Sequence, residues 1–165
     1  MFLARKISLA KWSKKSELEV GEIPADAVTA DLRTQDNKLS FWRCGDAEEI
    51  EINEAVLALS AVGTRVDKID VVWLAADDLQ NDGQTLQDTK ERTPVLELAE
   101  LHVDVCRLDY IRLGKVAQHI FTAIQKDQYL RLGKARVKQL LAEAVEQERI
   151  DPNDLQQRVC EELGL

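Results

Sequence analysis

Two carboxylates directly follow a short apolar run in the middle of the chain. Asp77 and Asp78 come just after Ile69–Leu74, a run rich in β-branched residues that predicts a strand buried on both faces. Carboxylates at the carboxyl end of a buried strand often bind divalent metals or act in general acid–base chemistry. One hypothesis is therefore a metal-dependent hydrolase or nuclease that uses Asp77 and Asp78.

The same segment also has a simpler interpretation. From Asp78 onward it begins like an EF-hand calcium loop, but Gln80 occupies the third ligand position. Thr89 stands at the twelfth position, where such a loop carries glutamate. We therefore favour an acidic, solvated loop in which Asp77 or Asp78 caps a helix, and we assign no metal and no other cofactor.

A histidine and a cysteine are spaced so that they touch on one helix face. His102 and Cys106 are four residues apart in a segment with helical periodicity, and Asp109 follows one turn later. A zinc site here needs further ligands such as Cys44 or Cys160, and a thiol nucleophile needs His102 to lower the pKa of Cys106. A buried structural cysteine beside a hydrogen-bonded histidine is the favoured interpretation.

One short motif occurs twice in the second half of the chain. The residues from Tyr110 to Lys115 read YIRLGK, and those from Tyr129 to Lys134 read YLRLGK. Two copies are too few for a repeat protein. The alternatives are coincidence between two helix-end segments, which we favour, and a paired binding surface. The candidate binding residues are Tyr110, Arg112, Tyr129 and Arg131.

A basic patch surrounds the second copy of this motif. Basic residues at helical spacing could contact phosphates, which makes a nucleic-acid-associated protein a further alternative. Three glutamates follow directly, so ion pairing within a helix is as good an explanation. The patch runs over Lys126–Lys138 and consists of Lys126, Arg131, Lys134, Arg136 and Lys138.

Composition restricts the class of protein. The 165 residues are 45% hydrophobic and 32% charged, with a net charge of −8, a balance typical of a globular acidic protein. The negative charge makes general attraction to nucleic acid unfavourable. No apolar stretch has the length of a membrane span, and the three cysteines are too far apart for a disulfide framework. We expect a cytoplasmic protein.

The first half of the chain predicts a small sheet with one helix. Phe2–Trp12 is a plausible strand, and alternating residues predict a hairpin of Val28–Thr34 with Leu39–Cys44. Apolar residues at helical spacing predict a helix over Ile52–Val62. Ile69–Leu74 supplies the next strand.

The second half of the chain predicts helices. Thr93 and Pro94 resemble a helix start, and the apolar stripe then continues to Ile124. Further helices are expected over Lys134–Gln147 and from Asp151 onward. The predicted fold is α+β, with a mostly antiparallel sheet of three or four strands followed by three helices. The predicted parts are 1–76 with the sheet, 77–93 as an acidic connection and 94–165 as the helical half.

None of these patterns converges on a catalytic site. The chain has no glycine-rich phosphate loop, no nucleophile-elbow motif and no zinc-protease motif. The leading hypothesis is a non-enzymatic binding protein, an accessory or regulatory protein of bacterial type. It has a protein partner or associates with itself, because acidic proteins steer electrostatically toward basic partners.

Overall fold

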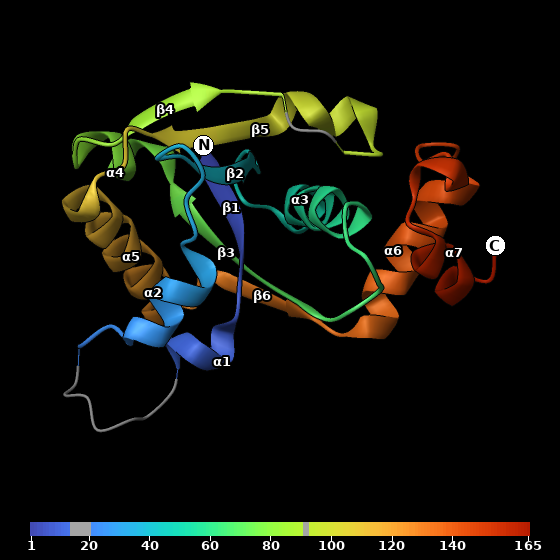
Figure 1. The fold of residues 1–165 in the computed structure, drawn as a ribbon, viewed down its shortest axis with the longest axis horizontal. Helices are drawn as coiled ribbons and strands as arrows, with labels where there is room; N and C mark the ends of the chain where they lie inside the picture. The colour runs from blue at the N-terminus through green and yellow to red at the C-terminus, as the bar shows by residue number, and fades with distance from the viewer. Residues whose placement is uncertain (14–20, 91–92) are drawn as a thin grey trace.

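The computed structural model describes residues 1–13, 21–90 and 93–165, and Figure 1 shows the path of the chain. Six strands alternate with helices along almost the whole sequence. In chain order the elements are β1 (Phe2–Ile7), α1 (Leu9–Trp12), α2 (Ala25–Asp31), β2 (Leu39–Arg43), α3 (Glu49–Ala61), β3 (Ile69–Ala75), α4 (Ala76–Asn81), β4 (Thr85–Asp88), the 3₁₀ helix η1 (Leu96–Leu101), β5 (His102–Cys106), α5 (Tyr110–Gln125), β6 (Tyr129–Leu132), α6 (Lys134–Glu146), the 3₁₀ helix η2 (Pro152–Asp154) and α7 (Gln157–Leu163).

The strands form one antiparallel sheet in the order β4-β5-β2-β1-β3-β6. The predicted α+β class and antiparallel pairing are therefore confirmed, but the sheet has six strands rather than three or four. β5 and β6 come from the segment for which we predicted helices alone. They pair with β2 and β3, so strands from both sides of the acidic connection share one sheet.

Helices pack on both faces of the sheet and create two hydrophobic clusters. Because strand side chains alternate between faces, neighbouring Leu3 and Ala4 belong to different clusters. The first cluster includes residues of α3, α6 and α7, and the second includes residues of α1, α2, α4 and α5. Fully buried residues such as Leu3 and Phe41 contribute about 1.5–3 kcal/mol each.

The predicted hairpin of Val28–Thr34 with Leu39–Cys44 is wrong in its first arm. Residues 25–31 form α2, which begins after Pro24 in an extended conformation. Alternation of Val28, Ala30 and Leu32 suggested a strand, but a helix also places Val28 and Leu32 on one side, one turn apart. The turn before β2 is present, since Gln35 and Lys38 pair across Asp36 and Asn37.

The helix predicted from Pro94 to Ile124 is replaced by η1, β5 and α5. All five residues of β5 are buried. His102 and Cys106, four apart, lie on one face in a strand as well as in a helix, so their spacing did not distinguish the two. The β-branched Val103 and Val105 between them are the local signal for a strand.

Several other predicted elements are confirmed. The helix predicted over Ile52–Val62 is α3, which starts with a capping box formed by Glu48 and Glu51. The predicted strand Ile69–Leu74 is β3, and the helix predicted over Lys134–Gln147 is α6. Within the described ranges, none of the helices has the length and apolarity needed to cross a bilayer.

Candidate functional site

An apolar groove lies between α2 and α5, which lie beside each other in Figure 1. Its volume is about 530 Å³. Each helix contributes residues at i, i+3, i+4 and i+7, so each presents one continuous stripe to the groove. The lining is Ile23, Ala25, Val28, Thr29 and Leu32 on one side, and Tyr110, Leu113, Gly114 and Ala117 on the other.

Two large side chains stand exposed at the start of α5, beside this groove. Tyr110 is 92% exposed and Ile111 is 74% exposed. The helix start that presents them is fixed by Asp109, whose carboxylate accepts a hydrogen bond from the Arg112 backbone N–H at 2.8 Å. Tyr110 lines the groove, and an exposed large side chain in an apolar hollow is typical of an interaction surface.

Gly114 keeps the α5 side of the groove open. A glycine within a helix costs about 1 kcal/mol relative to alanine. A Cβ atom added at Gly114 would meet nothing within 4 Å, so no neighbouring atom of the described chain demands a glycine there. Its missing side chain leaves room in the groove, which a helix or loop from another molecule can occupy.

The two copies of the tyrosine–arginine motif have different structures. Tyr110 and Arg112 start helix α5, where the Arg112 guanidinium turns back to the Arg107 carbonyl oxygen at 2.9 Å. Tyr129 and Arg131 belong to strand β6, where Tyr129 packs against the second cluster. Arg131 forms a hydrogen-bonded ion pair with Asp70 at 2.7 Å. Of the four candidate binding residues, only Tyr110 lines the groove.

Asp77 and Asp78 lie exposed in the first turn of α4. Carboxylates in this position interact favourably with the helix dipole. The predicted capping role is wrong, because the N-cap of α4 is Ala75 and no side chain caps this helix by a hydrogen bond. Across the described residues, no group of three or more histidine, cysteine, aspartate or glutamate side chains is arranged to hold a metal ion. The metal-dependent hydrolase therefore stays a prediction without supporting geometry.

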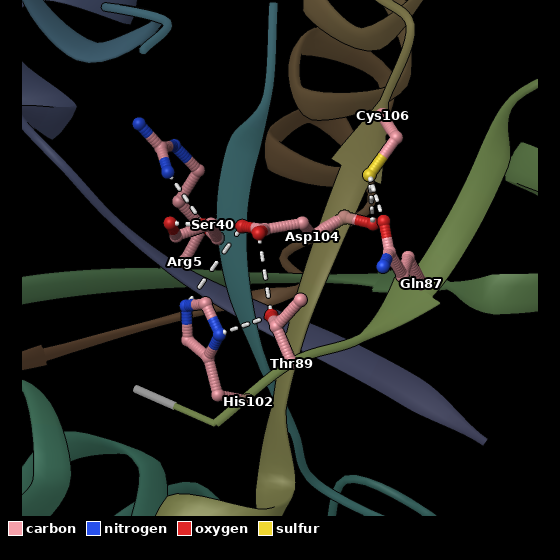
Figure 2. Close-up of polar contacts among 7 residues, drawn as sticks. All are labelled: Arg5, Ser40, Gln87, Thr89, His102, Asp104 and Cys106. Atoms are coloured by element: carbon pink, nitrogen blue, oxygen red, sulfur yellow. Dashed lines mark hydrogen bonds and ion pairs between the residues drawn. The ribbon is translucent and has the colours of Figure 1, made fainter. Parts of the chain in front are cut away.

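His102 belongs to a polar cluster on the β2–β5–β4 part of the sheet, shown in Figure 2. Its Nδ1 lies 2.7 Å from the Thr89 hydroxyl, and this hydroxyl donates to Asp104 at 3.2 Å. The Ser40 hydroxyl donates to the other oxygen of Asp104 at 3.1 Å. The Thr89 hydroxyl thus lies within hydrogen-bonding distance of both His102 and Asp104.

Cys106 lies on the same strand but has no activated thiol. Its Sγ donates to the Gln87 side-chain oxygen at 3.4 Å. Burial raises the pKa of the Cys106 thiol, whereas a nucleophile needs a lowered value. Burial likewise raises the pKa of Cys44 to about 12. The favoured interpretation of Cys106 as a buried structural cysteine agrees with this geometry.

Ion pairing occupies part of the predicted basic patch. Arg131 pairs with Asp70, and Lys134 forms an ion pair with Glu162 of α7. These two cations are thus partly neutralised by neighbouring carboxylates, which weakens the patch as a phosphate-binding surface.

Sequence reasoning missed the α2 wall of the groove, because residues 28–34 were taken for a strand. The helical spacing of Ala25, Val28, Thr29 and Leu32 after Pro24 was the available signal. Comparisons with protein-family models, with curated proteins and with solved structures found no match to this chain.

Proposed function

We propose that this chain is a non-enzymatic accessory protein that binds a basic amphipathic helix of a partner protein in the α2–α5 groove. The observation that carries the proposal is the apolar groove of about 530 Å³ with the exposed Tyr110 in its lining. Burying such side chains against a partner is a general source of binding free energy.

The shape of the groove favours a helix as the occupant. Two helices that each present an apolar stripe to one groove form its walls, and a third helix can pack between them through its own i, i+3, i+4 and i+7 residues. Ala25, Gly114 and Ala117 are small, so a helix backbone can approach closely. An amphipathic helix also satisfies its own backbone hydrogen bonds, which an apolar groove cannot do for it.

Charge favours a basic helix. The chain carries a net charge of −8, which steers positively charged partners toward it. Helix α2 carries Asp26 and Asp31 and no basic residue, although neither aspartate lines the groove and the Asp31 carboxylate is bound by Ser8 and Trp12. Asp26 is exposed, and within the described part of the chain no ion pair engages it. Lysine or arginine beside the apolar stripe of the partner would therefore meet a favourable potential.

The test uses a displayed library of helical peptides with apolar residues fixed at i, i+3, i+4 and i+7 and all other positions randomised. Selection on the full chain should enrich peptides rich in lysine and arginine. Their affinity should fall about tenfold or more for Gly114→Leu, because the new side chain fills the groove. Gly133→Leu is the matched control, since Gly133 is equally open but lies at the start of α6.

Two results would contradict the proposal. One is a selection that enriches no peptide; the other is a set of enriched peptides that bind Gly114→Leu as tightly as the wild type.

The alternative metal-dependent hydrolase makes a separate prediction. It requires Mg²⁺ or Mn²⁺ binding that is lost in the double variant Asp77→Asn, Asp78→Asn, and isothermal titration with each metal tests this.

A further inference from the structure

A second recess lies on the other side of α2, where the first two strands separate. β1 and β2 pair only at Leu3 with Arg43 and at Ala4 with Trp42. Beyond these positions a cleft of about 290 Å³ opens, and its lining includes Arg5, Arg33 and Lys38. Ser40 and Asp104 of the polar cluster also line this cleft, so it meets the network shown in Figure 2.

Arg5 brings a positive charge into this cleft, where the Asp31 carboxylate attracts it from beyond ion-pair distance. Its guanidinium donates to the backbone carbonyl oxygens of Asp31 and Ser40 and lies 5.5 Å from the centre of the Phe41 ring. Within the described ranges, no carboxylate oxygen lies within ion-pair distance of it. Burial lowers the pKa of Arg5 to about 10, which shows that its surroundings disfavour the charge.

Lys38 and Arg33 add two further cations at the same cleft. Lys38 is half-buried and ends a tight turn in which Asp36 and Asn37 both have left-handed backbone conformations. The turn is anchored by a hydrogen bond from the Leu108 N–H to the Asn37 carbonyl oxygen at 2.9 Å. Ion pairs to either cation are absent from the described part of the chain.

The lining of the cleft contains more cations than carboxylates. Three cations and two carboxylates, Asp36 and Asp104, line it, and Asp31 lies outside the lining near Arg5. Asp104 already accepts hydrogen bonds from Ser40 and Thr89. The half-buried Arg5 guanidinium donates to carbonyl oxygens, and an oxyanion beside it would add the attraction between opposite charges.

We propose that the cleft beside Arg5, Arg33 and Lys38 binds the oxyanion group of a small molecule, either a phosphate or a carboxylate. This site is separate from the α2–α5 groove and does not depend on the proposed helix partner. The volume of about 290 Å³ suits a small metabolite.

The experiment measures the melting temperature and the heat of binding of the full chain with sodium phosphate and, separately, with sodium succinate. Sodium chloride at matched ionic strength controls for general salt effects. Binding of phosphate alone, of succinate alone or of both would support the proposal and identify the source of the oxyanion. The double variant Lys38→Gln, Arg33→Gln should weaken the binding about tenfold. Arg5 stays unchanged because it holds β2 and α2 together.

Lys68→Gln is the matched control, because Lys68 is exposed and lies outside the cleft. It should keep the wild-type affinity. The proposal would be overturned if neither anion shifts the melting temperature beyond the chloride control. It would equally be overturned if the double variant responds to the anions as the wild type does.

Discussion

Tyr110 and Gly114 lie one turn apart on α5, and both line the same apolar groove. One is a large side chain left 92% exposed, and the other is a helix glycine whose missing side chain leaves space. An exposed aromatic side chain and a helix glycine each lower the stability of a chain on its own, but together they form a projection beside a hollow. Such a pair of features is typical of surfaces that contact another molecule.

The first prediction concerns stability at the two glycines of the repeated motif. Gly114→Ala should raise the free energy of unfolding by about 0.5–1 kcal/mol, because alanine favours the helix and meets no neighbouring atom. Gly133→Ala should bring no gain, because Gly133 is the N-cap of α6, where glycine is preferred to alanine. Urea unfolding of both variants checks this, and equal stabilisation would contradict the structural difference between the motifs.

The second prediction separates binding from folding at the two tyrosines. Tyr110→Ser should change the free energy of unfolding by less than about 0.5 kcal/mol, because the side chain is exposed. It should nevertheless weaken binding of the selected peptides about tenfold. Tyr129→Ser should lower the free energy of unfolding and leave peptide binding unchanged, since Tyr129 packs against the second cluster and lies outside the groove. Denaturant curves and fluorescence polarisation measure the two effects.

The third prediction concerns the polar cluster. Thr89→Val removes the hydroxyl between His102 and Asp104 and should destabilise the chain by about 1–3 kcal/mol, because two buried polar groups lose a partner. Thr64→Val, at an exposed position, should stay within about 0.5 kcal/mol of the wild type. An unchanged unfolding midpoint for Thr89→Val would show that this hydroxyl does not support the cluster.

The fourth prediction concerns acid unfolding. The Lys115 hydrogen bond, assisted by His119, lowers the pKa of Asp82. A carboxyl whose folded pKa lies below its unfolded value stabilises the fold at neutral pH, and this contribution is lost as the pH falls from about 4 through the lower folded value. Asp82→Asn should therefore flatten the decline of stability below about pH 4. Unfolding curves across this range measure the slope, and an unaltered slope would contradict the assignment.

The sequence predicted local structure better than long-range arrangement. α3 and α6 were predictable from apolar residues at helical spacing, and β3 from a continuous apolar run rich in β-branched residues. β5 was missed because His102 and Cys106 share a face in either a helix or a strand. Its identity depends on pairing with β2 and β4, which only the folded chain reveals.

The candidate site was predictable only in part. Tyr110 was identified from the repeated motif, but its Arg112 partner turns away to the Arg107 carbonyl oxygen. The other wall of the groove is α2, which tertiary contacts place there. Asp31 at its end accepts hydrogen bonds from Ser8 and Trp12, residues far earlier in the chain. No local pattern encodes that arrangement.

The most direct test of the helix-binding groove is a ¹⁵N–¹H correlation spectrum of the full chain titrated with a selected basic amphipathic peptide. The largest chemical-shift changes should fall on α2 and the first two turns of α5, and they should be absent in Gly114→Leu but present in Gly133→Leu. Changes concentrated on the opposite face of the sheet, at α3, α6 and α7, would show that the groove is not the binding site.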